Sequence, residues 1–199
     1  MTEVINYVLL AWQQTSAWEM AAVFFAILYL LLVIKESIWC WPMALISTSL
    51  YIFIFFDVRY YMESGLQIFY IIMAIYGWWQ WNTKAQSEAN LHISSWSTKQ
   101  HLIALSLIAI LVMISGFLLE QNTDAAYPWL DSLTTWGAVV TTWMVTKKIL
   151  ENWIYWIVLD SIGIFLFSQK ELYLTALLFI FYVILCFKGY SSWQKKYLA

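Results

Sequence analysis

ENWIYWIVLD, residues 151–160, opens a long apolar run in the C-terminal quarter of the chain. The length of that run predicts a membrane helix rather than a core strand. At about 100° per residue, Trp153, Trp156 and Asp160 fall within roughly a 60° arc of the helix. We therefore expect a carboxylate near the bilayer midplane, with two indoles on the same face nearer the helix start.

Two interpretations of this face stay open. A carboxylate at the helix centre costs about 2.5–3.5 kcal/mol on insertion scales, so it should face protein or water and have a partner. Each indole face attracts cations by about 0.5–2 kcal/mol, which favours a cradle for a positively charged aromatic ligand. The alternative is an interfacial tryptophan belt combined with a hydrogen bond between helices.

The composition predicts an all-α protein that crosses the membrane several times. Of the 199 residues, 63% are hydrophobic and only 11% are charged, which excludes a soluble domain. The first residues show no cleavable signal peptide. Seven apolar stretches are long enough to span the bilayer: Ala17–Ile34, Ile38–Phe56, Tyr60–Trp81, Leu102–Leu119, Trp129–Val145, Trp153–Phe167 and Leu172–Cys186.

The basic residues predict the orientation. Arg59 and Lys170 fall on one side of these seven spans, and the other eight of the ten Lys and Arg residues fall on the opposite side. The eight are Lys35, Lys84, Lys99, Lys147, Lys148, Lys188, Lys195 and Lys196. By the positive-inside rule the N-terminus is expected outside and the C-terminus in the cytoplasm.

Several other functional classes are disfavoured by the positions of the reactive residues. Cys40 and Cys186 lie in or beside apolar helices, which indicates neither an extracellular disulfide nor a metal site. His92 and His101 flank a loop instead of lying at helix centres, so no haem is expected. No cofactor and no nucleic-acid partner is predicted.

Two further functional classes are also disfavoured. A retinal protein needs a lysine near the middle of its last helix, whereas Lys188 lies close to the cytoplasmic end. An intramembrane enzyme could use Asp160 and Glu63 as an acid pair. Glu63 lies within about one turn of the outer end of its helix, so the two acids are expected to be too far apart to share a proton. The chain is therefore not expected to be an enzyme.

An internal repeat is visible when the chain is shifted by 112 residues without a gap. Glycine, tryptophan and lysine positions then coincide, which chance matching of apolar residues does not produce. The matched pairs include Lys35 and Lys147, Trp41 and Trp153, Ser49 and Ser161, Tyr61 and Tyr173, Tyr70 and Tyr182, Gly77 and Gly189, and Trp81 and Trp193. Each copy holds three helices, and the fourth helix between them makes the two copies parallel, a transporter architecture with the substrate site at the repeat interface.

The domain boundaries follow from this repeat. Residues 17–82 are expected to form the first three-helix repeat, and residues 129–194 the second. Residues 83–128 hold a loop, the linker helix and an outer loop. All three parts belong to a single transport domain.

The two copies differ where a ligand without twofold symmetry needs an asymmetric site. Asp160 falls on Thr48, Gln67 on Phe179 and Glu63 on Thr175. Thr135 and Thr142 share one face of the fifth helix, where back-bonding to the helix is the alternative to ligand contact. The predicted substrate-binding residues are Trp153, Trp156, Asp160, Asn152, Gln67, Tyr70, Glu63, Thr48, Trp41, Thr135 and Tyr182.

Several motifs in order resemble the PnuC family of bacterial vitamin transporters. They are WP at 41–42, QIFY at 67–70, YGWWQW at 76–81, TKKILENWIYWIVLD at 146–160 and LYLTALL at 172–178. The resemblance covers the chain from the first helix to the seventh. It implies a SWEET-like parallel-repeat fold, a homotrimer and a location in the bacterial inner membrane, in contact with lipid.

The same resemblance implies uptake of a vitamin by facilitated diffusion. A cytoplasmic kinase would then phosphorylate the vitamin and trap it. Nicotinamide riboside is the expected substrate, thiamine is the alternative, and riboflavin is carried by other relatives. Nicotinamide riboside carriers often end the ENWxxWxxx motif in Asn, whereas this chain has Asp160. An ionised acid only accepts hydrogen bonds, which suits a carboxamide donor and suits the thiazolium and aminopyrimidine of thiamine at least equally well.

Overall fold

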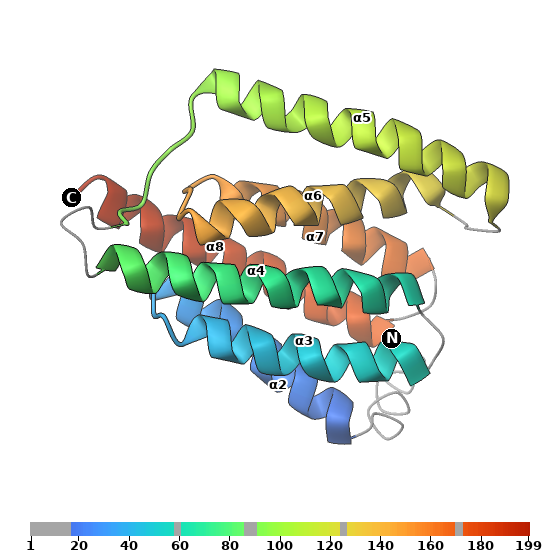
Figure 1. Ribbon diagram of the computed structural model, residues 1–199, viewed down its shortest axis with the longest axis horizontal. Helices are drawn as coiled ribbons and strands as arrows, with labels where there is room; N and C mark the ends of the chain where they lie inside the picture. The colour runs from blue at the N-terminus through green and yellow to red at the C-terminus, as the bar shows by residue number, and fades with distance from the viewer. Residues whose placement is uncertain (1–16, 58–60, 86–90, 124–126, 170–172) are drawn as a thin grey trace, which may run out of the picture. The chain divides into compact units, whose positions relative to one another are not determined.

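The computed structural model describes residues 17–57, 61–85, 91–123, 127–169 and 173–199, and within these ranges it holds seven α-helices (Figure 1). Their order is α2 (Ala17–Ile34), α3 (Cys40–Asp57), α4 (Tyr61–Ala85), α5 (Thr98–Asn122), α6 (Pro128–Thr146), α7 (Asn152–Gln169) and α8 (Tyr173–Tyr197). The α-helical class predicted from the sequence is confirmed.

The helix bounds follow the apolar stretches closely, with one clear difference. The last stretch was expected to end at Cys186, but α8 continues to Tyr197. The extra turns are polar and contain Lys188, Lys195 and Lys196, because long straight-chain residues favour helix outside an apolar segment as well. Within the described residues, Ala17–Ile34, Thr98–Asn122 and Ala176–Tyr197 are long and apolar enough to cross a membrane by length and composition.

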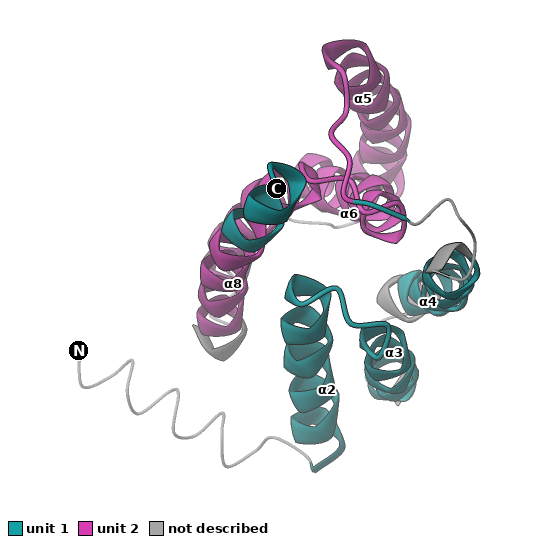
Figure 2. Cartoon of the chain, turned by 90° about the vertical axis from the view of Figure 1, so that its left-hand side faces the viewer, with its two compact units in different colours: residues 1–92, 191–199 teal, residues 93–190 magenta. Residues whose placement is uncertain are grey.

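The chain divides into two compact units, which Figure 2 distinguishes by colour. The first contains residues 1–92 and 191–199, and the second contains residues 93–190. Helix α5, which the sequence analysis places between the two repeats, therefore belongs to the second unit.

In the first unit, small residues let the helices approach closely. The Ser47 hydroxyl of α3 donates to the Ala22 carbonyl of α2 at 2.9 Å. A methyl group on Gly77 of α4 would lie 2.3 Å from the Trp41 ring of α3, so the indole lies directly on the glycine backbone. The Trp41 ring also meets Trp81 edge to face at 5.2 Å. Membrane helices pack in this way because lipid provides no hydrophobic force between them.

Helix α5 packs against α6 in the second unit, and two of the contacts involve tryptophans of α6. The Trp136 indole N–H donates to the Ser115 hydroxyl at 3.0 Å, and the Trp129 ring lies over Gly116. Ala104 and Ile108 of α5 are also buried, but many of its apolar side chains point outward, and Leu102 and Met113 are more than 60% exposed. Apolar exposure of this extent suits a helix that faces lipid.

The turn after α2 and the turn after α6 have the same backbone geometry, 112 residues apart. Glu36 and Lys148 both adopt positive φ, at 55° and 52°. The amides of Glu36 and Ser37 bond back to Val33 and Leu32. Those of Lys148 and Ile149 bond in the same pattern to Val145 and Met144. Both ends are Schellman motifs, in which a left-handed residue satisfies the last helix carbonyls.

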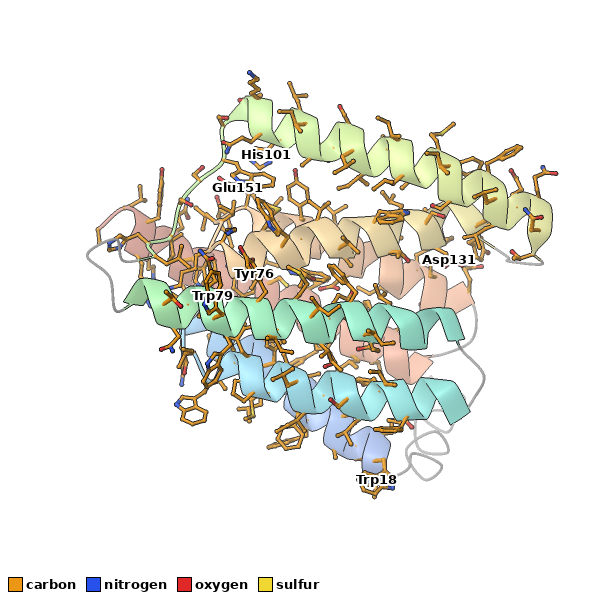
Figure 3. The ribbon with its side chains drawn as sticks, in the orientation of Figure 1. Trp18, Tyr76, Trp79, His101, Asp131 and Glu151 are labelled. Atoms are coloured by element: carbon orange, nitrogen blue, oxygen red, sulfur yellow. The ribbon has the colours of Figure 1, made fainter. Side chains whose placement is uncertain are left out.

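Exposed tryptophans lie at both ends of the first unit (Figure 3). Trp18 at the start of α2 is 69% exposed, while Trp79 near the end of α4 is 58% exposed and lies at the opposite end. Tryptophan is enriched at the two water–lipid interfaces of membrane proteins. The arrangement agrees with helices that cross a bilayer.

Candidate functional site

Asp160 is buried within the apolar part of α7. Its side chain is only 6% exposed, and its Oδ2 lies 3.8 Å from the Sγ atom of Cys186 on α8. Within the described residues, this contact with a weak S–H donor is the only hydrogen bond of the carboxyl group, and no cationic side chain is bonded to it. The predicted midplane acid therefore has a neutral partner in the protein.

Two ring-on-glycine contacts hold α7 and α8 together on either side of this pair. Toward the start of α7, the Trp153 ring lies on Gly189, where a methyl group would come within 2.6 Å of it. Toward the end of α7, the Phe179 ring lies on Gly163, where the corresponding distance is 2.5 Å. Only glycine allows such an approach, which brings Cys186 within reach of Asp160.

The helices 112 residues earlier in the chain have the same tryptophan–glycine contact but lack the acid and the thiol. Trp41 on Gly77 corresponds to Trp153 on Gly189. At the position of Asp160, Thr48 turns its hydroxyl back to the Ala44 carbonyl of its own helix at 2.8 Å. Ala74 stands at the position of Cys186 and is buried. The pair of polar groups is thus present on α7 and α8 and absent from the corresponding positions of α3 and α4.

The two predicted indoles of α7 differ in environment. Trp153 is completely buried and packs on Gly189. Trp156 is only partly buried. Trp153 and Asp160 both contact α8, which agrees with the arc predicted for these two residues. The place of Trp156 on that face and ligand stacking on either indole stay predictions.

Asn152 and Trp41 lie at equivalent ends of their repeats and carry polar atoms without partners. Asn152 is fully buried and its Nδ2 donates to the Ile149 carbonyl at 2.6 Å. Its Oδ1 has no hydrogen bond among the described residues, and neither has the buried Nε1 of Trp41. Their roles in substrate binding also remain predictions.

The remaining predicted residues are dispersed over α4, α6 and α8. Gln67 and Thr135 are partly buried. Tyr70 contacts the Phe69 ring at 5.8 Å, and Tyr182 contacts the Phe179 ring at the same distance. The side chain of Glu63 lies outside the described residues. Among the side chains that the structure describes, no group of three His, Cys, Asp or Glu residues could hold a metal ion.

A polar cluster that the sequence did not predict lies where the chain enters α5. The Ser95 hydroxyl and the Trp96 amide both donate to the Glu151 carboxylate, the second at 3.2 Å. The Ser94 backbone bonds to the turn before α7, donating to Lys148 and accepting from Leu150. Glu151 and His101 lie at the same end of the second unit (Figure 3).

Aromatic contacts extend this cluster. His101 Nδ1 lies 3.0 Å from the Tyr155 hydroxyl, and the two rings stack. The Trp96 ring contacts the rings of His101 and Trp143. Glu151 thus fastens the segment before α5 to the start of α7. The only signal in the sequence was an acid at the head of the motif that ends in Asp160.

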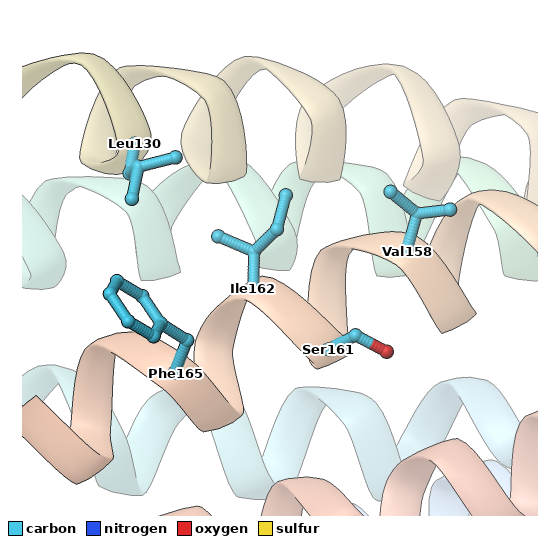
Figure 4. A pocket seen from close by; sticks show the side chains of 5 residues that line it. All are labelled: Leu130, Val158, Ser161, Ile162 and Phe165. Atoms are coloured by element: carbon cyan, nitrogen blue, oxygen red, sulfur yellow. The ribbon is translucent and has the colours of Figure 1, made fainter.

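An apolar groove between α6 and α7 lies away from the acid. It has a volume of about 430 Å³ and is lined by Leu130, Val158, Ser161, Ile162 and Phe165 (Figure 4). The four lining residues of α7 are roughly 100–160° around the helix from Asp160. The groove therefore lies on another face of α7 and is not the acid's site.

The comparison with known proteins agrees with this architecture. The crystal structure of the vitamin B3 transporter PnuC matches with a TM-score of 0.74 and 21% identity, over 96% of this chain and 88% of that one. This similarity shows that the chain has the same fold.

Two sequence relatives are transporters. The nicotinamide riboside transporter PnuC of Escherichia coli (strain K12) is 25% identical over 177 residues, 75% of this chain and 73% of the relative. The riboflavin/roseoflavin transporter RibM of Streptomyces davaonensis is 23% identical over 164 residues, 80% of this chain and 76% of the relative. The family model for the nicotinamide mononucleotide transporter matches residues 16–195. The chain therefore belongs to this family of multi-pass membrane transporters, the PnuC family that its motifs predicted.

Proposed function

We propose that the protein imports a cationic vitamin or vitamin precursor, with nicotinamide riboside as the substrate and thiamine as the alternative. The observation that carries this proposal is Asp160, a buried acid whose only described hydrogen bond is with the thiol of Cys186. The similarity to a nicotinamide riboside transporter supports the same substrate.

The chemistry of the two vitamins fits an acid with a neutral partner. A buried carboxylate is costly unless a positive charge or several donors satisfy it. Nicotinamide riboside brings a pyridinium ring and a carboxamide, and thiamine brings a thiazolium ring and an aminopyrimidine. Each therefore supplies both a positive charge and N–H donors to an acceptor-only group.

The proposed architecture is a pair of parallel three-helix repeats, of which the second carries the acid and the thiol. The matched left-handed turns at Glu36 and Lys148 support it, as do the matched contacts of Trp41 with Gly77 and Trp153 with Gly189. In known parallel-repeat transporters the substrate site lies at the repeat interface. The acid and thiol of the second repeat make the site asymmetric, as these ligands require.

The proposed mechanism is facilitated diffusion followed by phosphorylation by a cytoplasmic kinase. Among the described residues no second acid or histidine is bonded to Asp160 that could relay a proton from it. We place the C-terminus in the cytoplasm of a bacterium, with the protein in the inner membrane as a homotrimer. An alkaline phosphatase fused after Ala199 should then stay inactive, and an active fusion would contradict this orientation.

A binding measurement tests the substrate. Purified protein is titrated by calorimetry with nicotinamide riboside, thiamine and riboflavin, a neutral vitamin. We expect the wild type to bind a cationic vitamin, and Asp160→Asn to weaken that binding about tenfold or more, because a charged hydrogen bond is worth about 1.5–3 kcal/mol.

Asp131→Asn is the matched control. Asp131 is a partly buried acid in the first turn of α6, outside the predicted binding set. The control should bind like the wild type. Wild-type binding of riboflavin alone, or unchanged binding of the cation by a folded Asp160→Asn variant, would contradict the proposal.

A further inference from the structure

The second repeat places a thiol beside the buried acid. Cys186 is 1% exposed, and its Sγ lies 3.8 Å from Asp160 Oδ2. The other carboxylate oxygen, Oδ1, has no hydrogen bond within the described residues. The two oxygens of one carboxylate therefore have different surroundings.

The position of this pair is set by the contacts around it. Trp153 on Gly189 and Phe179 on Gly163 fix the spacing of α7 and α8 on both sides of Asp160 and Cys186. The χ2 torsion of an aspartate, which orients its carboxylate, is normally broad. A donor bonded to Oδ2 limits this rotation. The neighbouring helix thus controls the direction of Oδ1.

The comparison between the repeats shows whether the Cys186 sulfur is needed for helix packing. In the first repeat the pair of facing positions holds Thr48, which bonds to its own helix, and Ala74 on the neighbouring helix. In the second repeat the corresponding pair holds Asp160 and Cys186. An alanine is enough to fill this place in the seam, so the sulfur is not needed for helix spacing.

We propose that Cys186 is a positioning residue for Asp160: its S–H group donates to Oδ2 and holds the carboxylate so that Oδ1 accepts from the bound cationic vitamin. This inference rests on the proposed function, because it assigns Asp160 to the ligand. It makes Cys186 a determinant of affinity for cations, acting through the acid and without contacting the ligand itself.

The test uses two variants that remove the donor and one that keeps it. With nicotinamide riboside and thiamine as probes, Cys186→Ala and Cys186→Val should each bind the cation about three- to tenfold more weakly, since a thiol is a weak donor to a charged acceptor. Cys186→Ser keeps a donor and should stay within about threefold of the wild type. Cys40→Ala removes the other fully buried cysteine and should leave binding unchanged.

A double-mutant cycle distinguishes positioning from packing. In the Asp160→Asn background the further change Cys186→Ala should alter affinity by less than about twofold, because coupled residues are not additive. An equal loss in both backgrounds would identify a packing role and overturn the inference. Thermal denaturation shows whether Cys186→Ala and Cys186→Val are folded. If both variants are unfolded, the inference is also overturned.

The two hypotheses fail in different ways. If the wild type binds neither cationic vitamin, the proposed function fails and the inference with it. If the wild type binds, Asp160→Asn weakens binding and folded Cys186→Ala and Cys186→Val bind like the wild type, the function stands and only the positioning role is overturned.

Discussion

At the scale of the residue, Trp153 and Trp156 look equivalent in the sequence but differ in burial. Both belong to one face of α7, at a spacing that suggests a pair of stacking surfaces. In the fold, Trp153 is fully buried over Gly189, whereas Trp156 remains partly exposed. The helical period predicts on which face a residue lies, but not the size of the residue that packs against it. Against Trp153 that residue is Gly189, 36 positions away in the chain.

The two indoles should therefore respond differently to substitution. Trp153→Ala leaves a cavity over Gly189 and should lower the free energy of unfolding by about 3–5 kcal/mol, seen as a lower melting temperature in detergent. Trp156→Ala should melt close to the wild type and bind a cationic vitamin more weakly by about 1–3 kcal/mol. Equal melting temperatures for the two alanine variants would contradict the difference in packing.

Asp160 was predictable from the sequence, whereas its thiol partner was not. An acid in an apolar run stands out by composition, and its depth follows from the length of the run. Cys186 is 26 residues away, on another helix, and a cysteine in an apolar segment usually behaves as a small hydrophobic residue. Its contact with Asp160 depends on how closely Gly163 and Gly189 let the helices approach.

At the scale of the element, the segment before α5 is bonded to the start of α7 through Glu151, a contact that we call the fastener. Most helix bounds were predictable from apolar runs and polar breaks, whereas the end of α8 was not, because its polar last turns stay helical to Tyr197. The fastener was not predictable either, because its bonds join residues 55 or 56 positions apart in the chain. Neither Ser95 nor Trp96 lies in an element whose period could have placed it opposite Glu151.

Removing the Glu151 carboxylate should loosen this fastener. Glu151→Ala abolishes the acceptors of the Ser95 hydroxyl and the Trp96 amide and should cost about 1–2 kcal/mol of unfolding free energy, and Glu151→Gln should cost less because it keeps one acceptor. The melting temperature, followed by circular dichroism during heating in detergent, provides the measurement. Glu120→Gln, an exposed acid on α5, is the control and should melt like the wild type.

At the scale of the whole molecule, the proposed mechanism predicts that the substrate gradient alone drives uptake. In proteoliposomes with the membrane potential clamped at zero, uptake of the cationic vitamin should stop at equal concentrations and should not respond to a pH gradient. The clamp is needed because each charge moved is worth about 2.3 kcal/mol per 100 mV. Accumulation driven by an inward proton gradient, and lost in Asp160→Asn, would make Asp160 a coupling site and rule out facilitated diffusion.

The 112-residue correspondence bears on how the substrate of such a carrier can change during evolution. Gly77 and Gly189 admit no side chain beneath their indoles, and the left-handed turns at Glu36 and Lys148 constrain the backbone in the same way in both copies. Positions 160 and 186 are free of these constraints, as Thr48 and Ala74 show in the other copy. Under the proposed function, a descendant can therefore acquire a new ligand preference by two point mutations at positions 160 and 186, while the matched glycines and turns are inherited unchanged.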